Sequence, residues 1–439
     1  MTSSTSSSEH GSVSLSNGRA GLLIILMALL VLGPAVLFVR GFTGFAEKSG
    51  GDVFGIQRIR SVHAEMDYMA QRPGPTVLVF GSSLTNEGFS PRHFDRQAEA
   101  LLGTDITSFN IGMGNMKPSY QLLLAKRLRE AHERAGRKAA LSVIELTPFL
   151  LTAKRNAFRP FMTEQVTAVL MSREELMQEL WNDPERFARL FTIKYLRDGI
   201  SAEAITGGLR FLIGSAQSQV PLIASLGEEQ IALITEQRRL QGELNRQIGQ
   251  QHPDTRKSIV WNPATQGGLI DMEDLSADTQ GLASQLIRMM RDQRTLQRDA
   301  RDREECCDIR NLVFDASMVD EFVAIVEEFK QFSERVEIVL LPTNHTVIAP
   351  TPEALARQQQ VLQQISARTG VPLLDYQQHP QFAADDFYDA THLSLDSGKP
   401  RFSALLARDL ADELVSVIGP NGKTVAGKTA VMGAESGGG

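Results

Sequence analysis

Short apolar runs alternate with helix-like segments in two blocks of this 439-residue chain, and this alternation constrains the fold more than any other feature. Continuous runs of apolar and β-branched residues predict buried strands. In the first block the expected strands are residues 76–80, 105–110 and 140–146, and in the second block they are 336–342 and 371–375. Strands that alternate with helices predict a parallel sheet with helices on both faces, which is a three-layer α/β/α fold.

Proline, serine and glycine mark the ends of the helices between these strands. Ser90 precedes a proline and is expected to cap a helix, Ser317 is expected to cap another, and Gly370 is expected to end a third. The expected helices are residues 91–102, 118–135, 318–332, 352–369 and 398–417.

The two blocks are separated by residues 150–315, which are too many for a structureless loop inside a compact domain. We expect a helical insertion or cap on the α/β core, and we interpret the highly charged run 291–305 as a solvated helix face. The less polar segment 204–226 is expected to pack on the core, with a membrane or a partner as the alternatives. The expected helices of the insertion are residues 163–181, 184–202, 228–247 and 282–303.

The N-terminal region contains a long apolar run. Residues 1–19 are rich in serine and are expected to be disordered, whereas residues 20–39 contain no charged side chain. A helix of this length can span a hydrocarbon layer of about 30 Å, so we expect a retained transmembrane anchor. A cleaved signal peptide is the alternative, although its apolar region is usually shorter. Residues 41–75 are then expected to form a juxtamembrane stalk, and residues 418–439 a flexible tail.

Charge and cysteine content limit the classes of function. The net charge is −7 and the chain has no dense cluster of lysine and arginine, which argues against nucleic acid as a partner. The chain has two cysteines, Cys306 and Cys307. Adjacent cysteines rarely bridge because the bond strains the peptide between them, so no disulfide is expected. The sequence has no Cys/His metal pattern, and it implies no metal or organic cofactor.

Polar residues follow four of the expected strands, and ligands of open parallel sheets bind at this end of the strands. These polar segments are residues 81–83, 110–115, 145–147 and 342–345. A fifth polar segment, residues 388–394, precedes the last expected helix.

Asp389 and His392 lie three positions apart in this fifth segment, so the carboxylate can reach the imidazole within one turn. A serine hydroxyl is a weak nucleophile that needs such a base, and Ser82 and Ser83 follow the first strand. The sequence therefore predicts a triad in the chain order Ser, Asp, His. The alternatives are an ordinary strand-to-helix turn around the serines and a solvated loop around Asp389.

The run GSSL at residues 81–84 resembles the Gly-Asp-Ser-Leu block of the SGNH/GDSL hydrolases, and DATH at 389–392 resembles their Asp-x-x-His block. This resemblance implies an SGNH-like core in which Ser83 is the nucleophile, His392 is the base and Asp389 orients the base. Gly114 is similar to the family glycine whose backbone N–H helps to form the oxyanion hole.

The chain also departs from this family. Ser82 stands where the family usually has Asp, and Glu-Leu-Thr-Pro at 145–148 replaces the third block with its oxyanion-binding Asn. Loss of one oxyanion donor costs about 100–1,000-fold in rate. Thr147, Asn115 or Asn344 could supply a substitute donor. We expect the substrate site to contain Ser82, Asn115, Asn344 and His345, although His345 could instead cap the loop that follows it.

The whole layout resembles the branch that contains the D-alanyl transfer protein DltD and related extracytoplasmic O-acyltransferase proteins. Members of that branch have one membrane span and work with membrane-bound O-acyltransferases (MBOAT proteins). The resemblance implies a serine acyltransferase that moves an acetyl or D-alanyl-like group onto an extracytoplasmic glycan or cell-envelope polymer. A non-catalytic accessory of such a complex and a membrane-anchored GDSL esterase or lipase are the alternatives.

The resemblance also implies a protein of the cytoplasmic (inner) membrane with its domain in the periplasm or outside the cell. The loop charges point the other way, because Arg40, Lys48, Arg58 and Arg60 follow the apolar run. By the positive-inside rule these charges alone place the domain in the cytoplasm. We follow the resemblance, since long domains are translocated with little regard to flanking charge.

Overall fold

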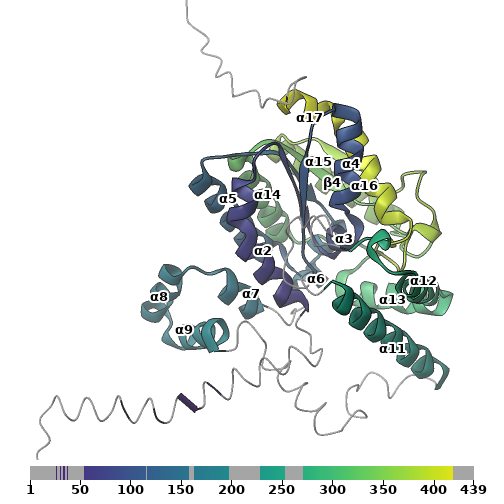
Figure 1. The fold of residues 1–439 in the computed structure, drawn as a ribbon, viewed down its shortest axis with the longest axis horizontal. Coiled ribbons are helices and arrows are strands. Elements are labelled where there is room, and N and C mark those ends of the chain that lie inside the picture. The colour runs from purple at the N-terminus through teal and green to yellow at the C-terminus, as the bar shows by residue number, and fades with distance from the viewer. Residues whose placement is uncertain are drawn as a thin grey trace, which may run out of the picture.

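The computed structural model describes residues 54–114, 116–157, 163–196, 228–252 and 270–418, together with five separate positions between 26 and 37. A sheet lies at its centre, with helices packed around it (Figure 1). The five strands lie in the order β2-β1-β3-β4-β5, and every pair of neighbouring strands is parallel. The predicted α/β class and parallel sheet are confirmed. The strands are β1 Thr76–Gly81, β2 Thr107–Gly112, β3 Ala139–Glu145, β4 Ser333–Leu340 and β5 Leu373–Asp375.

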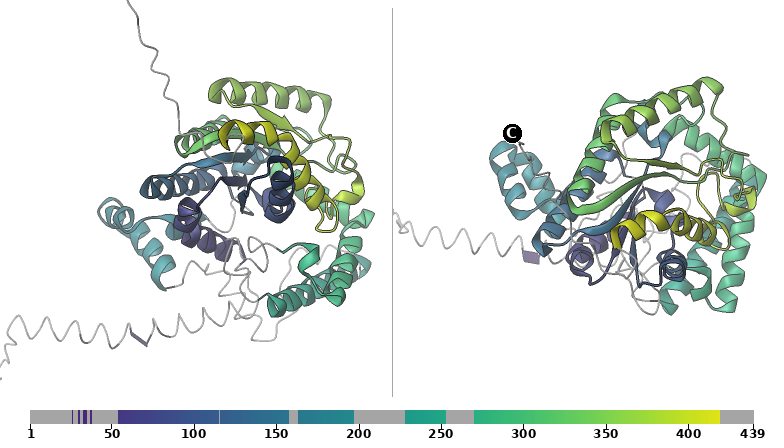
Figure 2. Two further views of the ribbon diagram at one scale, coloured as in Figure 1. Left: turned by 45° about the horizontal axis from the view of Figure 1, so that its top comes forward. Right: turned by 90° about the horizontal axis from the view of Figure 1, so that it is seen from above.

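Side chains of the buried strands alternate between two separate cores, as the two-residue period of a strand requires. Leu78 and Phe80 belong to one core, and Val77 and Val79 belong to the other. Helices cover both faces of the sheet (Figure 2), which gives three layers. The first core is covered by α2 Phe54–Gln71, α5 Pro118–Ala135, α14 Ala316–Phe332 and α15 Pro352–Thr369, and the second by α4 Pro91–Leu102, α16 Gly398–Asp409 and α17 Ala411–Ile418.

Helices with strong end signals have the predicted bounds. Helices α4, α5 and α15 each have a proline in the first turn and end at a glycine in the left-handed conformation. These glycines have φ near +65°, which a residue with a Cβ adopts only at a cost in energy.

Several predicted boundaries are wrong. Strand β4 is Ser333–Leu340 rather than 336–342, and β5 is Leu373–Asp375 rather than 371–375. Strand β2 lies two residues further along the chain than predicted, so Asn110 is inside the strand. Helix α14 begins at Ala316, because the Asp315 side chain accepts the backbone N–H of Ser317 and takes the capping position predicted for Ser317. The helix predicted over 398–417 is divided at Leu410 into α16 and α17.

Part of the segment predicted as a stalk belongs to the core. Helix α2 packs beside α5, and its Val62 and Met69 side chains are fully buried in the first core. Residues 41–53 of the predicted stalk lie outside the described residues.

The described part of residues 150–315 is helical and forms two small cores of its own. The helix predicted over 163–181 is interrupted by a capping box at Ser172 and Glu175, and the one predicted over 282–303 is interrupted at the capping residue Asp292. Residues 204–226 lie outside the described part of the chain. The helices are α6 Ala153–Ala157, α7 Thr163–Leu170, α8 Arg173–Asn182, α9 Pro184–Phe191, α11 Glu228–Gln251, α12 Ala277–Met290 and α13 Gln293–Cys307.

Residues 20–39, which we expect to span a membrane, lie outside the described residues except for the five separate positions, as do residues 1–19 and 419–439. Within the described ranges, no helix has both the length and the apolar character needed to cross a bilayer.

Candidate active site

The strand order places the carboxyl end of β1 between β2 and β3, where the chain leaves the sheet in opposite directions. Ligands of open α/β sheets bind at such a switch point. Strand β1 ends at Gly81, and Ser82 then caps the short helix α3, Ser83–Gly88, by accepting the backbone N–H of Leu84. Ser83 is therefore the first residue of a helix at the switch point.

Ser83, His392 and Asp389 form a continuous hydrogen-bonded chain at this point. The Ser83 Oγ lies 2.9 Å from His392 Nε2, and His392 Nδ1 lies 2.7 Å from Asp389 Oδ2. His392 and Asp389 are buried, whereas Ser83 is partly exposed. The structure thus brings together the three residues that the sequence identifies as nucleophile, base and orienting carboxylate.

Local contacts fix both the carboxylate and the imidazole. Asp389 Oδ1 accepts the backbone N–H groups of Thr391 at 2.8 Å and of His392 at 2.7 Å. The Tyr388 ring stacks on the imidazole, with ring centroids 5.6 Å apart and planes inclined by 18°. The run Asp-x-x-His therefore forms one tight turn in which the carboxylate holds both the backbone and the ring.

The two buried groups shift each other's titration in opposite directions. Burial by itself raises the pKa of Asp389, but the neighbouring imidazolium and the hydrogen bonds from His392 outweigh it and hold this pKa below its usual range. Burial by itself lowers the pKa of His392, but the Asp389 carboxylate outweighs it and raises this pKa above its usual value. Asp389 therefore stabilises the imidazolium that forms when the imidazole takes a proton from Ser83.

Ser82 does not contact this triad but a second carboxylate, that of Glu145 at the end of β3. Its hydroxyl donates to Glu145 Oε1 at 2.5 Å and its backbone N–H donates to Oε2 at 2.8 Å. Thr85 donates its backbone N–H at 2.9 Å and its hydroxyl at 2.6 Å to Oε2, and Thr147 donates its hydroxyl to Oε1. The carboxylate thus accepts five hydrogen bonds and fixes the turn that presents Ser83.

This arrangement corrects two sequence interpretations. Ser82 was expected to bind substrate and Thr147 to stabilise the oxyanion, but both hydroxyls donate to Glu145, although Ser82 also lines the cavity beside Ser83. Glu145 was predicted only as part of the polar segment 145–147, with no role of its own. The same arrangement requires a glycine before Ser82, because a Cβ at Gly81 would lie 2.3 Å from Thr85 Oγ1 and 2.4 Å from Glu145 Oε2.

Gly114 lies beside the nucleophile. A Cβ placed on Gly114 would lie 3.7 Å from Ser83 Cβ, so the loop after β2 passes close to the hydroxyl. Arg58 of α2 supports this loop by donating to the carbonyl oxygens of Asn110 at 2.6 Å and Gly112 at 3.3 Å. Asn115, the other candidate on this loop, lies outside the described residues.

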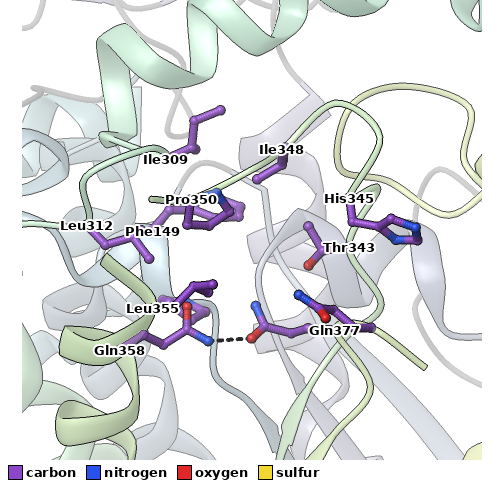
Figure 3. Close-up of a pocket in the computed structure, with 12 residues that line it drawn as sticks. Phe149, Ile309, Leu312, Thr343, His345, Ile348, Pro350, Leu355, Gln358 and Gln377 are labelled. Atoms are coloured by element: carbon purple, nitrogen blue, oxygen red, sulfur yellow. Dashed lines mark hydrogen bonds between the residues drawn. The ribbon is translucent and has the colours of Figure 1, made fainter. Parts of the chain in front are cut away.

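Asn344 and His345 are not part of the cavity beside Ser83. Asn344 is buried and donates its side-chain N–H to the Asp389 carbonyl oxygen at 3.4 Å, so it supports the triad turn. His345 is exposed and lines a separate, smaller pocket of about 40 Å³ with Phe149 and Ile348 (Figure 3). The expectation that these two residues bind substrate next to Ser83 is not met by their positions.

A cavity of about 200 Å³ opens onto Ser83. One side comes from the α/β core, and the other comes from α6 and α13 of the inserted segment. Its lining residues are Ser82, Ser83, Leu84, Met116, Phe149, Leu150, Arg155, Arg303, Cys306 and Cys307.

Helix α13 also supports the triad turn. Asp299 Oδ2 accepts the Ala390 N–H at 3.0 Å, and Arg303 lies 3.5 Å from Asp299. Arg291, which ends the preceding helix α12, donates to the Phe387 carbonyl oxygen at 2.8 Å. The interpretation of the run 291–305 as a solvated face is therefore wrong for one side of the helix. An i, i+4 pair of opposite charges such as Asp299 and Arg303 is also typical of an exposed helix face, so the sequence does not distinguish this side.

The structure also joins Cys306 and Cys307 in a disulfide, against our expectation for adjacent cysteines. Both residues lie at the end of α13 and line the cavity. A disulfide between neighbours requires a particular local backbone, and the sequence alone does not reveal that the end of α13 provides it.

Comparisons with known proteins do not assign a family to this chain. No protein-family model matches it, and no curated protein matches its sequence.

Proposed function

We propose that this protein is a membrane-anchored, SGNH-like serine acyltransferase that moves an acyl group onto an extracytoplasmic glycan or cell-envelope polymer. The observation that carries the proposal is the chain of hydrogen bonds from Ser83 through His392 to Asp389, which opens onto a cavity. A hydroxyl, an imidazole and a carboxylate in this order are what nucleophilic acyl transfer requires.

In the first half of the reaction, Ser83 Oγ attacks the carbonyl carbon of an acyl donor while His392 Nε2 accepts the hydroxyl proton. Asp389 stabilises the imidazolium that results. When the tetrahedral intermediate collapses, the imidazolium returns this proton to the leaving group, and the acyl group remains as an ester on Ser83. The intermediate carries a negative oxygen, and we assign its stabilisation to the backbone N–H groups of Ser83 and Gly114.

In the second half, an acceptor hydroxyl takes the place of the leaving group. His392 removes its proton, the alkoxide attacks the acyl carbon, and the Ser83 Oγ leaves and recovers the proton from His392. Water in place of the acceptor would give hydrolysis. Helices α6 and α13 narrow the space around Ser83, which favours a bound acceptor over bulk water.

The place of the reaction in the cell is part of the proposal. We assign residues 20–39 to an anchor in the cytoplasmic membrane, and we place the catalytic domain on its outer side beside an MBOAT partner that supplies the acyl group. The disulfide between Cys306 and Cys307 supports an oxidising compartment, since disulfides persist there and are rare in the cytosol.

A deletion strain tests this function. We expect the wild-type gene to restore alkali-labile acyl esters on the purified envelope polymer, as measured by gas chromatography of the released acid. The Ser83→Ala and His392→Ala variants should restore none, and membrane levels of each protein, measured by immunoblot, provide the control.

Two results would point elsewhere. Full restoration of envelope esters by Ser83→Ala would show a non-catalytic accessory role. Rapid, sustained hydrolysis of p-nitrophenyl acetate by the purified full-length protein, without a polymer acceptor, would show an esterase.

A further inference from the structure

Two arginines line the cavity beside Ser83. Arg155 comes from α6 and Arg303 comes from α13, so the inserted segment supplies both. The described lining residues of this cavity include no aspartate or glutamate. The other lining side chains are apolar or carry no net charge, so the two arginines are the charged side chains of this lining, and Arg303 also lies 3.5 Å from Asp299 of the same helix.

Arg303 is close enough to Arg155 for its positive charge to disfavour the charged form of Arg155. Burial, and after it the positive charge of Arg303, lowers the pKa of Arg155 to about 10. Arg155 is 5% exposed, so water screens its charge poorly. An anionic group bound between the two side chains would offset both the burial and the repulsion.

We propose that Arg155 and Arg303 form an anion subsite that selects a substrate with a negative charge near the acylated hydroxyl and a neutral acyl group. This inference rests on the proposed function of Ser83. A carboxylate or a phosphate of the acceptor fits the two guanidinium groups, because each guanidinium presents a planar set of N–H donors to the anion's oxygens.

The charges of the two arginines also distinguish between an acetyl and a D-alanyl group, the two acyl groups that the sequence leaves as alternatives. A D-alanyl ester carries an ammonium group close to the reacting carbonyl, and two arginines in the cavity would repel it. An acetyl ester has no such charge. The cavity, at about 200 Å³, is also smaller than the 300–1,000 Å³ that is usual for whole ligands. It therefore suits one acyl group and one charged substituent, with the rest of the polymer outside.

Binding of a small molecule at the subsite should slow the labelling of Ser83 by a fluorophosphonate, and this protection can be measured with the full-length protein. The probes are two matched pairs at constant ionic strength, methyl glucuronide with methyl glucoside and glycerol 2-phosphate with glycerol. We expect the anionic member of at least one pair to protect at roughly tenfold lower concentration than its neutral partner. The pair that shows the larger difference identifies carboxylate or phosphate as the preferred anion.

Substitutions show whether the two arginines cause the preference. Arg303→Gln and Arg155→Gln should each remove most of it, and Arg303→Lys should keep part because it keeps the charge. Arg301→Gln is the matched control, since Arg301 is exposed on the same helix α13, and it should keep the full preference. Arg303 is only partly buried, so its variants test the subsite even where Arg155→Gln fails to fold.

The acyl preference has its own readout. The measured quantity is the first-turnover rate with p-nitrophenyl acetate divided by that with the p-nitrophenyl ester of D-alanine. This ratio should be several-fold lower in Arg303→Gln than in the wild type. Because both proteins are measured with the same two esters, the intrinsic reactivity of each ester cancels in the comparison.

The outcomes separate this inference from the proposed function. Equal protection by charged and neutral probes, with Ser83 still labelled, would overturn the anion subsite and leave the nucleophile in place. An equal loss of preference in Arg301→Gln would also overturn it. Should Ser83 not be labelled at all, the proposed function fails, and calorimetry of the same four probes with Ser83→Ala protein decides the subsite independently.

Discussion

Two buried carboxylates lie at the same end of the sheet, and they differ in what faces them. Glu145 is enclosed by Ser82, Thr85 and Thr147 and accepts five hydrogen bonds from them. Asp389 also accepts backbone N–H groups, but one of its oxygens is kept for the imidazole of His392. The contacts of Glu145 end at the three residues that surround it, whereas those of Asp389 lead through His392 to the hydroxyl of Ser83, which borders a cavity.

The comparison shows why two neighbouring serines have different chemistry. Ser82 and Ser83 are consecutive, yet the hydroxyl of Ser82 donates to a carboxylate that has no proton relay behind it. The hydroxyl of Ser83 meets a base whose pKa is raised by Asp389. The hydrogen-bond partner of each hydroxyl therefore sets its reactivity. His392 activates Ser83, whereas Glu145 binds Ser82 and holds the turn that presents Ser83.

The largest expected effect separates the two serines. Ser83→Ala should abolish covalent labelling by a fluorophosphonate, a loss of roughly 10⁴-fold or more, because the nucleophile is gone. Ser82→Ala should keep labelling per folded molecule while it lowers stability by about 1–3 kcal/mol, since it removes a helix cap and a hydrogen bond to Glu145. Gel fluorescence and urea unfolding of the same preparations measure the two effects.

Asp389→Asn breaks the triad while keeping its shape. We expect a loss of about 10⁴-fold in labelling rate, because the amide cannot stabilise the imidazolium and favours the wrong tautomer. The wild-type rate should rise with pH as His392 loses its proton, with a midpoint above the usual value of 6.5, since Asp389 raises this pKa. Any residual rate in the variant should have its midpoint at lower pH. A midpoint that does not move would show that Asp389 does not act on His392.

The next effect is on stability. Glu145→Gln turns an amide N–H₂ toward groups that are themselves donors, whichever way the amide is oriented. We expect the free energy of unfolding to fall by about 2–4 kcal/mol in urea titrations, because buried donors lose their acceptor. Glu305→Gln, on an exposed part of α13, is the control and should change it by less than about 0.5 kcal/mol. Equal effects of the two variants would contradict a structural role for the Glu145 contacts.

Asp299→Asn should have the smallest effect on activity. Asp299 holds the Ala390 N–H of the triad turn and touches neither Ser83 nor the cavity, so it is a positioning residue. We expect a loss of about tenfold in labelling rate, a larger loss in Asp299→Ala, and no loss in Asp302→Asn, which is exposed on the same helix. Identical rates in all three variants would show that α13 does not position the triad turn.

Local signals in the sequence were enough for the sheet and for the helices with strong end signals. The apolar runs located all five strands, but with shifted bounds for some of them. Strand β2 was placed two residues too early, and β4 was placed two to three residues too late because its first residues, Ser-Glu-Arg, are polar. Helix α2 was missed because its mean hydropathy is low and it follows an apolar run, so it resembled a linker. The side of α2 that is buried can be recognised only from its packing against α5 in the folded protein.

The three residues of the triad could be found because two of them share one turn and the third follows a strand. The residues around them could not. Asp299, Arg303 and Arg155 reach the site from an insertion whose contacts are distant in the chain. The same limit explains Thr147 and Ser82, whose hydroxyls have the right chemistry for a substrate site but donate to Glu145, although Ser82 also lines the cavity.

The position of a covalent adduct shows whether Ser83 is the nucleophile that His392 activates. Full-length protein treated with a fluorophosphonate would be digested and its peptides sequenced by mass spectrometry. We predict one adduct on Ser83, absent in Ser83→Ala and strongly reduced in His392→Ala. An adduct on Ser82 would show that Ser83 is not the nucleophile, and equal labelling of wild-type and His392→Ala protein would show that His392 does not activate it.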